Sequence, residues 1–365
     1  MAEWPCALEG LVINPEFWRG KRVFLTGHTG FKGGWLALWL TKMGAQVFGY
    51  SLEPPSQPNL FSILKLEKRL AVSSIADIRE AEALERAMAD SQPDIVMHLA
   101  AQPLVRYSYR EPAETFAVNV MGTVNLLQAV RSVDTASAVV NVTTDKCYEN
   151  KEWVWPYREN EALGGYDPYS SSKACAEMVS AAYRQSFLNE AGVPLATARA
   201  GNVIGGGDFA EDRLIPDFLR ATDAGENLII RSPEAVRPWQ HVLEPLAGYL
   251  SLAQLLSEVG VGYAEAWNFG PDESDAKTVK WIAEALCSRI PGAAWEHDGS
   301  PQVHEALALR LDSSKAKSRL QWRPRWNLQS ALEMTLSWHQ AWRSGKDMYA
   351  VTCEQIDAYM ASPVG

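Results

Sequence analysis

The stretch Lys21–Gly33, KRVFLTGHTGFKG, determines the fold predicted for this chain. Lys21–Thr26 is typical of a buried strand, and the glycines that follow are spaced G-x-x-G-x-x-G. Such a turn between a strand and a helix brings backbone amides close to a pyrophosphate, and the N-terminus of the helix adds further donors. This context favours a dinucleotide site over a turn that only packs. The residues expected to contact the dinucleotide are Gly27, His28, Thr29, Gly30, Phe31, Lys32 and Gly33.

Short β-rich runs alternate with amphipathic stretches in the first half of the chain. The predicted strands are Lys21–Thr26, Ala45–Ser51, Ala71–Ser74, Asp94–Leu99 and Ala138–Thr143, and the predicted helices are Trp35–Met43, Glu80–Ala89 and Ala113–Val133. This alternation predicts βαβ units, and hence an α/β fold with a Rossmann-type, doubly wound parallel sheet.

The regular alternation of predicted strands and helices ends near residue 200, where Gly and Pro become more frequent. We expect a dinucleotide-binding Rossmann domain over residues 17–200. Residues 201–345 are expected to form a smaller, mixed α/β substrate-binding part that returns in places to the first domain. Leu328–Arg343, rich in Leu and Trp, is predicted to be a C-terminal packing helix.

Composition excludes several classes of function. The 34 Lys and Arg against 44 Asp and Glu give a net charge of −10, and no basic run is present, so nucleic-acid binding is disfavoured. No membrane span is expected. The five cysteines show no metal-ligand spacing and fit a reducing, cytoplasmic protein without a metal site. They are Cys6, Cys147, Cys175, Cys287 and Cys353.

A Y-x-x-x-K motif follows Asp167-Pro168, a pair that is typical of a helix start. The spacing places the Tyr169 phenol and the Lys173 ammonium on one helical face. A nearby cation stabilises phenolate and lowers the pKa of the tyrosine from about 10, which makes Tyr169 a candidate general base. Taken alone, this motif also arises by chance from a surface tyrosine and a solvated lysine.

The fifth predicted strand ends directly upstream, in Thr143-Thr144-Asp145-Lys146. Ligands bind at the carboxyl ends of strands in this architecture. A hydroxyl, a carboxylate and an amine in succession are hard to explain by packing, although a polar loop is the alternative. Together with the glycine loop and Tyr169, the order of these motifs is specific.

Other strand ends extend the predicted dinucleotide site. Tyr50–Glu53, after the second strand, offers no Asp at the expected place and no Arg, so this loop leaves the choice between NAD and NADP open. After the third and fourth strands, the expected cofactor contacts are Asp77, Ile78, Leu99, Ala100 and Ala101.

The chain resembles the nucleotide-sugar dehydratases and epimerases of the extended short-chain dehydrogenase/reductase family, and within it the CDP-sugar 4,6-dehydratases. The resemblance runs from about Phe17 to Trp338, and its distinguishing segments are Phe17–Gly33, Glu53-Pro54-Pro55 and Thr144–Asn150. The related dTDP-glucose enzymes carry Asp-Glu where this chain has Asp145-Lys146, and simple 4-epimerases lack the acid-base pair.

The resemblance implies that bound NAD supports an internal redox cycle on CDP-D-glucose. The sugar is oxidised at C4, loses water across C5 and C6, and is reduced at C6, which yields CDP-4-dehydro-6-deoxy-D-glucose. Tyr169 would take the 4-hydroxyl proton, Thr144 would hold that oxygen, and Lys173 would hold the ribose. Lys146 would remove the C5 proton while Asp145 protonates the departing hydroxyl, and we expect this pair to act as a unit.

The resemblance also suggests substrate contacts and an assembly. Asn202 and Arg237 would contact the diphosphate, because a guanidinium suits bidentate phosphate binding. Arg213 and Arg231 are weaker candidates, while Gln102 and Arg106 could face the hexose. Ala113–Val133 and Ala174–Phe187 correspond to helices that meet across a two-fold axis in the family, which implies a homodimer or a dimer of dimers. Two ordinary sheet-covering helices are the alternative.

Three other functions stay open from the residues alone. A dehydratase of another nucleotide sugar is the first, because nothing in the residues distinguishes cytidine from uridine or thymidine. A nucleotide-sugar 4-epimerase is the second, and Asp145-Lys146 argues against it. The third is a non-catalytic dinucleotide sensor, which would have no need of Thr144, Tyr169 and Lys173.

Overall fold

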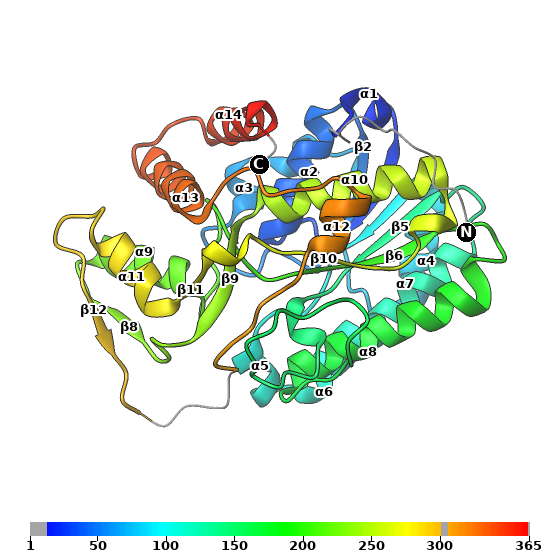
Figure 1. Cartoon of the computed structure of the whole chain (residues 1–365). Helices are drawn as coiled ribbons and strands as arrows, with labels where there is room; N and C mark the ends of the chain where they lie inside the picture. The colour runs from blue at the N-terminus through cyan, green and yellow to red at the C-terminus, as the bar shows by residue number, and fades with distance from the viewer. Residues whose placement is uncertain (1–12, 301–305, 364–365) are drawn as a thin grey trace.

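The computed structural model describes residues 13–300 and 306–363. Its main sheet has seven parallel strands in the order β10-β6-β5-β4-β1-β2-β3, which confirms the doubly wound α/β fold (Figure 1). The strands are β1 (Arg22–Thr26), β2 (Gln46–Ser51), β3 (Val72–Ile75), β4 (Ile95–His98), β5 (Ala138–Val142), β6 (Leu195–Ala200) and β10 (Ala266–Phe269). The order turns back between β1 and β4, and ligands bind at such switch points.

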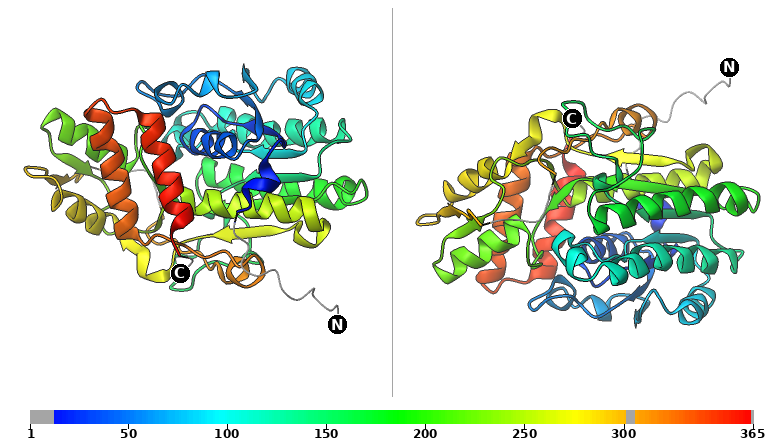
Figure 2. Two further views of the ribbon diagram at one scale, coloured as in Figure 1. Left: turned by 90° about the horizontal axis from the view of Figure 1, so that it is seen from above. Right: turned by 90° about the horizontal axis from the view of Figure 1, so that it is seen from below.

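Helices cover both faces of the sheet because its strands are apolar on both sides. Val23 and Leu25 of β1 pack on one side in a cluster with α2 and α10, while Phe24 packs on the other with α4 and α7. Views from above and below show these two helical layers (Figure 2). The long covering helices are α2 (Phe31–Lys42), α4 (Ala81–Ser91), α7 (Gly122–Arg131), α8 (Pro168–Tyr183) and α10 (Leu243–Val259), and α14 (Met348–Ala361) packs on α2 and α13.

A second group of elements forms its own core beside the carboxyl edge of the main sheet. Strands β7, β9 and β11 form one small sheet, and β8 pairs with β12 in another. The elements are β7 (Asn202–Ile204), α9 (Leu214–Ala224), β8 (Leu228–Ile230), β9 (Val236–His241), β11 (Ala276–Thr278), α11 (Val279–Cys287), β12 (Trp295–His297) and α13 (Leu328–Arg343).

Short helices and single turns complete the chain. These are α1 (Pro15–Trp18), α3 (Leu60–Ile63), η1 (Leu66–Lys68), α5 (Val105–Arg110), α6 (Pro112–Phe116), η2 (Ala117–Met121), η3 (Asp145–Cys147), η4 (Arg184–Leu188), η5 (Val261–Tyr263), η6 (Glu273–Asp275) and α12 (Ser314–Arg319). The turns η2 and η4 are π-helical.

The predicted elements match these bounds closely, with two differences. The first helix begins at Phe31 rather than Trp35, because the glycine loop leads directly into it. The single helix expected over Ala113–Val133 is α6, η2 and α7, so a π-helical turn interrupts it. The division into residues 17–200 and 201–345 stays a prediction. Both α10 and β10 come after residue 200 in the chain. Nevertheless, β10 is a strand of the main sheet, and α10 packs against that sheet.

Candidate active site

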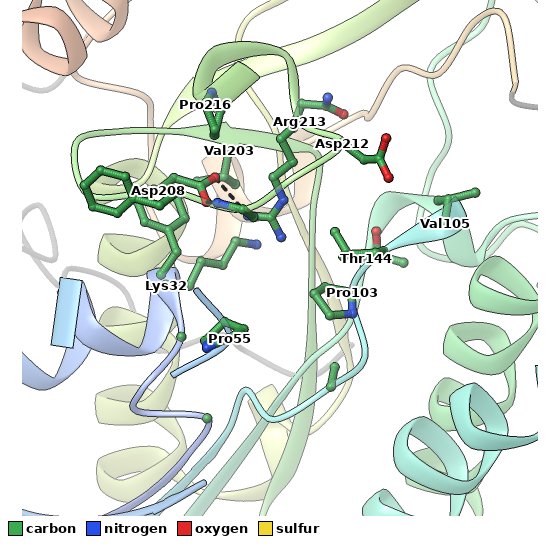
Figure 3. A pocket seen from close by; sticks show the side chains of 18 of the residues that line it. Lys32, Pro55, Pro103, Val105, Thr144, Val203, Asp208, Asp212, Arg213 and Pro216 are labelled. Atoms are coloured by element: carbon green, nitrogen blue, oxygen red, sulfur yellow. Dashed lines mark hydrogen bonds and ion pairs between the residues drawn. The ribbon is translucent and has the colours of Figure 1, made fainter. Parts of the chain in front are cut away.

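A cavity of about 580 Å³ lies where the carboxyl ends of the main-sheet strands face the second group of elements. It is lined by the glycine loop, by the ends of β2 to β6, by the start of α8 and by the segment from Gly201 to Arg213 (Figure 3). The predicted site residues that line it are Gly27, Thr29, Gly30, Phe31, Lys32, Gly33, Asp77, Ile78, Leu99, Ala100, Ala101, Arg106, Thr144, Asp145, Lys146, Tyr169, Lys173, Asn202, Arg213, Arg231 and Arg237.

The glycine loop is packed so closely that side chains do not fit in it. Gly27 has φ +78°, and a Cβ there would lie 2.7 Å from the amide nitrogen of Ala100. A Cβ on Gly33 would lie 2.0 Å from the carbonyl oxygen of Gly27. Gly30 caps α2 without a side-chain hydrogen bond, so the first amides of this helix stay available to a ligand. The loop therefore fits a dinucleotide pyrophosphate.

We expect Gly33→Ala to abolish dinucleotide binding, because the new Cβ would force the backbone at Gly27 to move. The dinucleotide released from the purified, denatured protein measures the effect. Gly262→Ala is the control, since a Cβ there meets no atom within 4 Å and Gly262 lies outside the cavity lining. Equal dinucleotide content in the Gly33→Ala variant and the parent would contradict this account of the loop.

Two predicted residues do not line the cavity. His28 is buried beside Phe61, and its Nε2 hydrogen-bonds the Ser73 hydroxyl at 2.8 Å. Burial lowers its pKa to about 4. The Gln102 side chain is occupied locally, because it donates to the Thr115 hydroxyl at 2.9 Å and accepts from the Leu104 amide at 2.5 Å. Both side chains were expected at the ligand and instead stabilise the loops around it.

The end of β2 is tied to the glycine loop. The Thr29 hydroxyl hydrogen-bonds the Ser51 hydroxyl and donates to the Leu52 carbonyl oxygen, each at 2.8 Å. Glu53 follows in the cavity lining and is the acid nearest in sequence to this point. Asp77 lies at the end of β3, where hydrogen bonds from Arg79 lower the pKa of its carboxyl group.

Thr144, Asp145 and Lys146 follow β5 and form the start of the turn η3. The Thr144 hydroxyl donates to Asp145 Oδ1 at 3.0 Å, whereas Asp145 Oδ2 is buried and has no hydrogen-bond partner within the described residues. Burial raises the pKa of Asp145, and the positive charge of Lys146 opposes that rise. Desolvation outweighs the neighbouring ammonium, so the carboxyl group is biased toward the protonated form that a general acid needs.

Tyr169 and Lys173 lie in the first turns of α8. The Asp167 side chain caps this helix by accepting the Ser170 amide at 2.9 Å. Burial raises the pKa of Tyr169 to about 12, opposed by a hydrogen bond with Thr144. Burial also lowers the pKa of Lys173 to about 8. The hydrogen bond between Thr144 and Tyr169 therefore connects the strand end after β5 with the first turn of α8.

The electrostatic environment of Tyr169 differs from the prediction. Lys173 was expected to lower the pKa of this phenol, but its ammonium donates to the Val142 carbonyl oxygen at 3.4 Å. The cation that favours the phenolate is Arg213, from the opposite wall of the cavity. The pKa of Tyr169 is raised rather than lowered because desolvation of the buried phenol outweighs the effect of the neighbouring positive charge.

Arginines on the second wall are held by acids that sequence reasoning missed. Arg213 pairs with the buried Asp208 at 2.8 Å (Figure 3). Asp212 accepts from Arg106 at 3.1 Å and from Arg231 at 2.6 Å, so it joins the two walls of the cavity. The signal in the sequence is the Asp that directly follows three glycines at 205–207, together with the Asp next to Arg213.

Glu177, one helical turn after Lys173, was also missed. It is buried, pairs with Arg199 at 2.7 Å, and accepts hydrogen bonds from the hydroxyls of Thr197 and Thr143. Although burial acts to raise the pKa of Glu177, the Arg199 charge lowers it overall. Because Thr143 precedes Thr144, this buried ion pair fixes the strand end that carries the candidate catalytic groups.

None of the histidines and cysteines that the structure describes lines the cavity. His98 is buried between the hydroxyls of Thr26 and Thr123, as expected for a core histidine. Cys6 and His304 lie outside the described residues, and the four described cysteines are free thiols. No cluster of possible metal ligands occurs in residues 13–300 and 306–363. Across these same ranges, no helix is long and apolar enough to cross a bilayer.

Comparison with known proteins shows the family to which the chain belongs. The family model described as GDP-mannose 4,6 dehydratase matches residues 24–335. The chain belongs to this family. Its relatives include the CDP-glucose 4,6-dehydratase of Salmonella typhimurium, which is 54% identical over 96% of this chain and 99% of that protein. A dTDP-glucose 4,6-dehydratase of Xanthomonas campestris is 26% identical over 88% of this chain and 94% of that protein.

Solved structures of similar fold include other enzymes of nucleotide sugars. The UDP-glucose 4-epimerase of Thermotoga maritima, solved with UDP-glucose, is 25% identical, with a TM-score of 0.73 over 87% of this chain and 98% of that one. The dTDP-glucose 4,6-dehydratase DesIV of Streptomyces venezuelae is 22% identical, with a TM-score of 0.73 over 89% and 98%. The similarity to these two solved structures supports the fold described above for this member of the dehydratase family.

Proposed function

We propose that this protein is a hydro-lyase that converts CDP-D-glucose to CDP-4-dehydro-6-deoxy-D-glucose and water, in deoxysugar biosynthesis. The observation that carries the proposal is the convergence of Thr144, Asp145, Lys146 and Tyr169 in one cavity beside the glycine loop. The 54% identity to a CDP-glucose 4,6-dehydratase over almost the whole chain supports the reaction and the nucleotide.

NAD is the proposed cofactor, and the residues present fit it. The Gly27 and Gly33 positions leave room for a pyrophosphate, and Asp77, Ile78 and Ala100 line the cavity at neighbouring strand ends. When bound, the oxidised nicotinamide supplies a hydride acceptor and a positive charge. Residues 17–200 would hold this cofactor, and residues 201–345 would hold most of the nucleotide sugar.

Tyr169 would accept the proton of the sugar 4-hydroxyl, and Thr144 would hold the same oxygen through the hydroxyl that contacts the phenol. A ketone at C4 acidifies the C5 hydrogen, which Lys146 would remove. Asp145 would give its proton to the departing 6-hydroxyl, since burial raises the pKa of this carboxyl group. Each of these residues lines the same cavity.

Cations and an amide on the second wall suit the nucleotide diphosphate. Arg237 is buried and lines the cavity with Asn202 and Arg213. Guanidinium groups make bidentate contacts with phosphate oxygens. Arg106 would face the hexose from the loop after β4, where Asp212 orients it.

The deciding experiment incubates the protein with CDP-, dTDP-, UDP- and GDP-hexoses and measures the 4-keto-6-deoxy product, with and without added NAD. The expected result is product from CDP-D-glucose. Product from another nucleotide alone would overturn the base assignment but keep the dehydration. Release of a C4 epimer without loss of water would overturn the dehydration, and no reaction with any hexose would favour a dinucleotide sensor.

We also propose a homodimer, or a dimer of dimers, formed through α6, η2, α7, α8 and η4. These elements lie side by side along one flank, and their exposed apolar side chains support a subunit interface (Figures 1 and 2). The side chains are Phe116, Met121, Met178 and Phe187. Free thiols at the four described cysteines support a reducing, cytoplasmic location.

Met178→Glu is expected to shift the protein to monomer, because the Met178 side chain is 54% exposed on α8 and a carboxylate would be desolvated in the interface. Light scattering after gel filtration measures the mass. Val261→Glu, at a comparably exposed apolar position away from these helices, is the control. A parent protein that is already monomeric, or a Met178→Glu variant with unchanged mass, would contradict the proposed interface.

A further inference from the structure

Lys32 is the one charged side chain of the glycine loop Gly27–Gly33. It lies in the first turn of α2, is half-buried, and lines the cavity. Its side chain points away from the loop toward Arg213 and Asp208 on the opposite wall (Figure 3). Within the residues that the structure describes, its ammonium donates no hydrogen bond. A cation in a cavity without a protein partner calls for an anionic ligand.

Four charged groups act on Lys32 from the surrounding elements: Arg213, Asp145, Lys173 and Asp208. Arg213 and Lys173 repel the Lys32 ammonium, whereas Asp145 and Asp208 attract it, and Arg213 has the largest effect of the four. Asp208 is already paired with Arg213 at 2.8 Å. A bound anion would offset the repulsion that the two cations exert on Lys32.

We propose that the Lys32 ammonium binds the diphosphate of the nucleotide-sugar substrate. The glycine loop then contacts the dinucleotide through its backbone and the substrate through this one side chain. This inference rests on the proposed function and changes the expectation that Lys32 serves the cofactor. A hexose hydroxyl carries no charge to offset the repulsion, whereas a diphosphate placed between Lys32 and Arg213 does so.

Binding of CDP and of cytidine to the full chain, measured by calorimetry, tests the proposal. Loss of one charge-assisted hydrogen bond predicts that Lys32→Met weakens CDP binding about 10- to 100-fold. Cytidine, which has no phosphate, should bind as it does to the parent. Lys32→Arg keeps the positive charge, so its affinity for CDP should fall less than that of Lys32→Met. Lys42→Met is the matched control, because Lys42 lies in the last turn of the same helix, outside the cavity, where it pairs with Asp357 at 3.0 Å.

The released dinucleotide and the melting temperature are recorded for every variant, and Lys32→Gln replaces Lys32→Met if that protein does not fold. Unchanged CDP affinity in the uncharged variant would overturn the proposal, as would equal losses for CDP and cytidine. A fall in dinucleotide content with unchanged CDP affinity would assign Lys32 to the cofactor instead.

Failure of the proposed function gives a different result. A parent protein that binds UDP, dTDP or GDP but not CDP disproves the base assignment, and the same Lys32 comparison is then made with the preferred diphosphate. A parent protein that binds none of the four overturns both proposals.

Discussion

Tyr169→Phe is expected to lower kcat by about 100- to 10,000-fold, which is the usual contribution of a positioned general base. The variant removes only the phenolic oxygen, while the ring keeps its buried place beside Thr144 and α8. Formation of the 4-keto-6-deoxy sugar measures the effect, and CDP binding by calorimetry shows whether the cavity is intact. We expect CDP affinity close to that of the parent, because Tyr169 is assigned to the sugar oxygen.

Tyr166→Phe is the matched control, since the Tyr166 side chain is 78% exposed and lies outside the cavity lining. It should keep the activity of the parent. Comparable activity in the Tyr169→Phe variant would show that another group takes the proton, and the proposed chemistry would need a different base.

The pH dependence follows from the same phenol. Burial raises the pKa of Tyr169 to about 12, so the free phenol is protonated at neutral pH. A base acts in its deprotonated form, so kcat/KM should rise with pH by up to about tenfold per unit below the apparent pKa. The residual rate of Tyr169→Phe should lack this rise. A parent rate that falls with increasing pH across pH 6 to 9 would argue against the phenol as base.

Asp145→Asn is expected to lower the dehydration rate by about 100- to 10,000-fold, because the amide keeps the shape of the side chain but has no acidic proton to donate. The buried Oδ2 without a partner is the atom from which we expect this proton to come. Product formation measures the loss. Asp134→Asn, an exposed carboxyl group after α7, is the control and should be fully active.

The coupling of Asp145 with Lys146 can be measured with a double variant. If the two groups act as a unit, Asp145→Asn with Lys146→Met should be no slower than the worse single variant. Lys146→Met should also lose exchange of the C5 hydrogen with solvent deuterium. Multiplicative losses would show that the two groups act independently, and normal C5 exchange without Lys146 would remove this residue from the mechanism.

Much of the fold could be predicted because its signals are local. The strands β1 to β5 agree with the predicted runs within one residue at each end, since apolar stretches bounded by turns fix strand positions. Helix α13 has the predicted bounds Leu328–Arg343. The interruption of the helix after Pro112 by η2 could not be predicted, because a π-helical turn has no pattern of apolar residues that distinguishes it from regular helix.

The candidate site was predictable to the same extent. Tyr169 and Lys173 are four residues apart on one helix, and Thr144 to Lys146 follow a strand, so their joint position follows from βαβ topology. His28 and Gln102 are different, because backbone position alone does not tell which way a side chain points. His28 packs beside Phe61, and Gln102 donates a hydrogen bond to Thr115. Neither partner is a neighbour in the sequence, so the local pattern does not reveal the contact.

The sequence by itself determined the strand, glycine loop and helix that form a dinucleotide site, and the spacing of the catalytic candidates, because φ angles and side-chain periodicity are properties of neighbouring residues. Only the tertiary structure decided the charges in the cavity. Arg213 rather than Lys173 acts on the Tyr169 phenol, and burial rather than Lys146 sets the direction of the Asp145 pKa. Desolvation and charge pairing depend on which distant segments meet, and that is settled when the chain has folded.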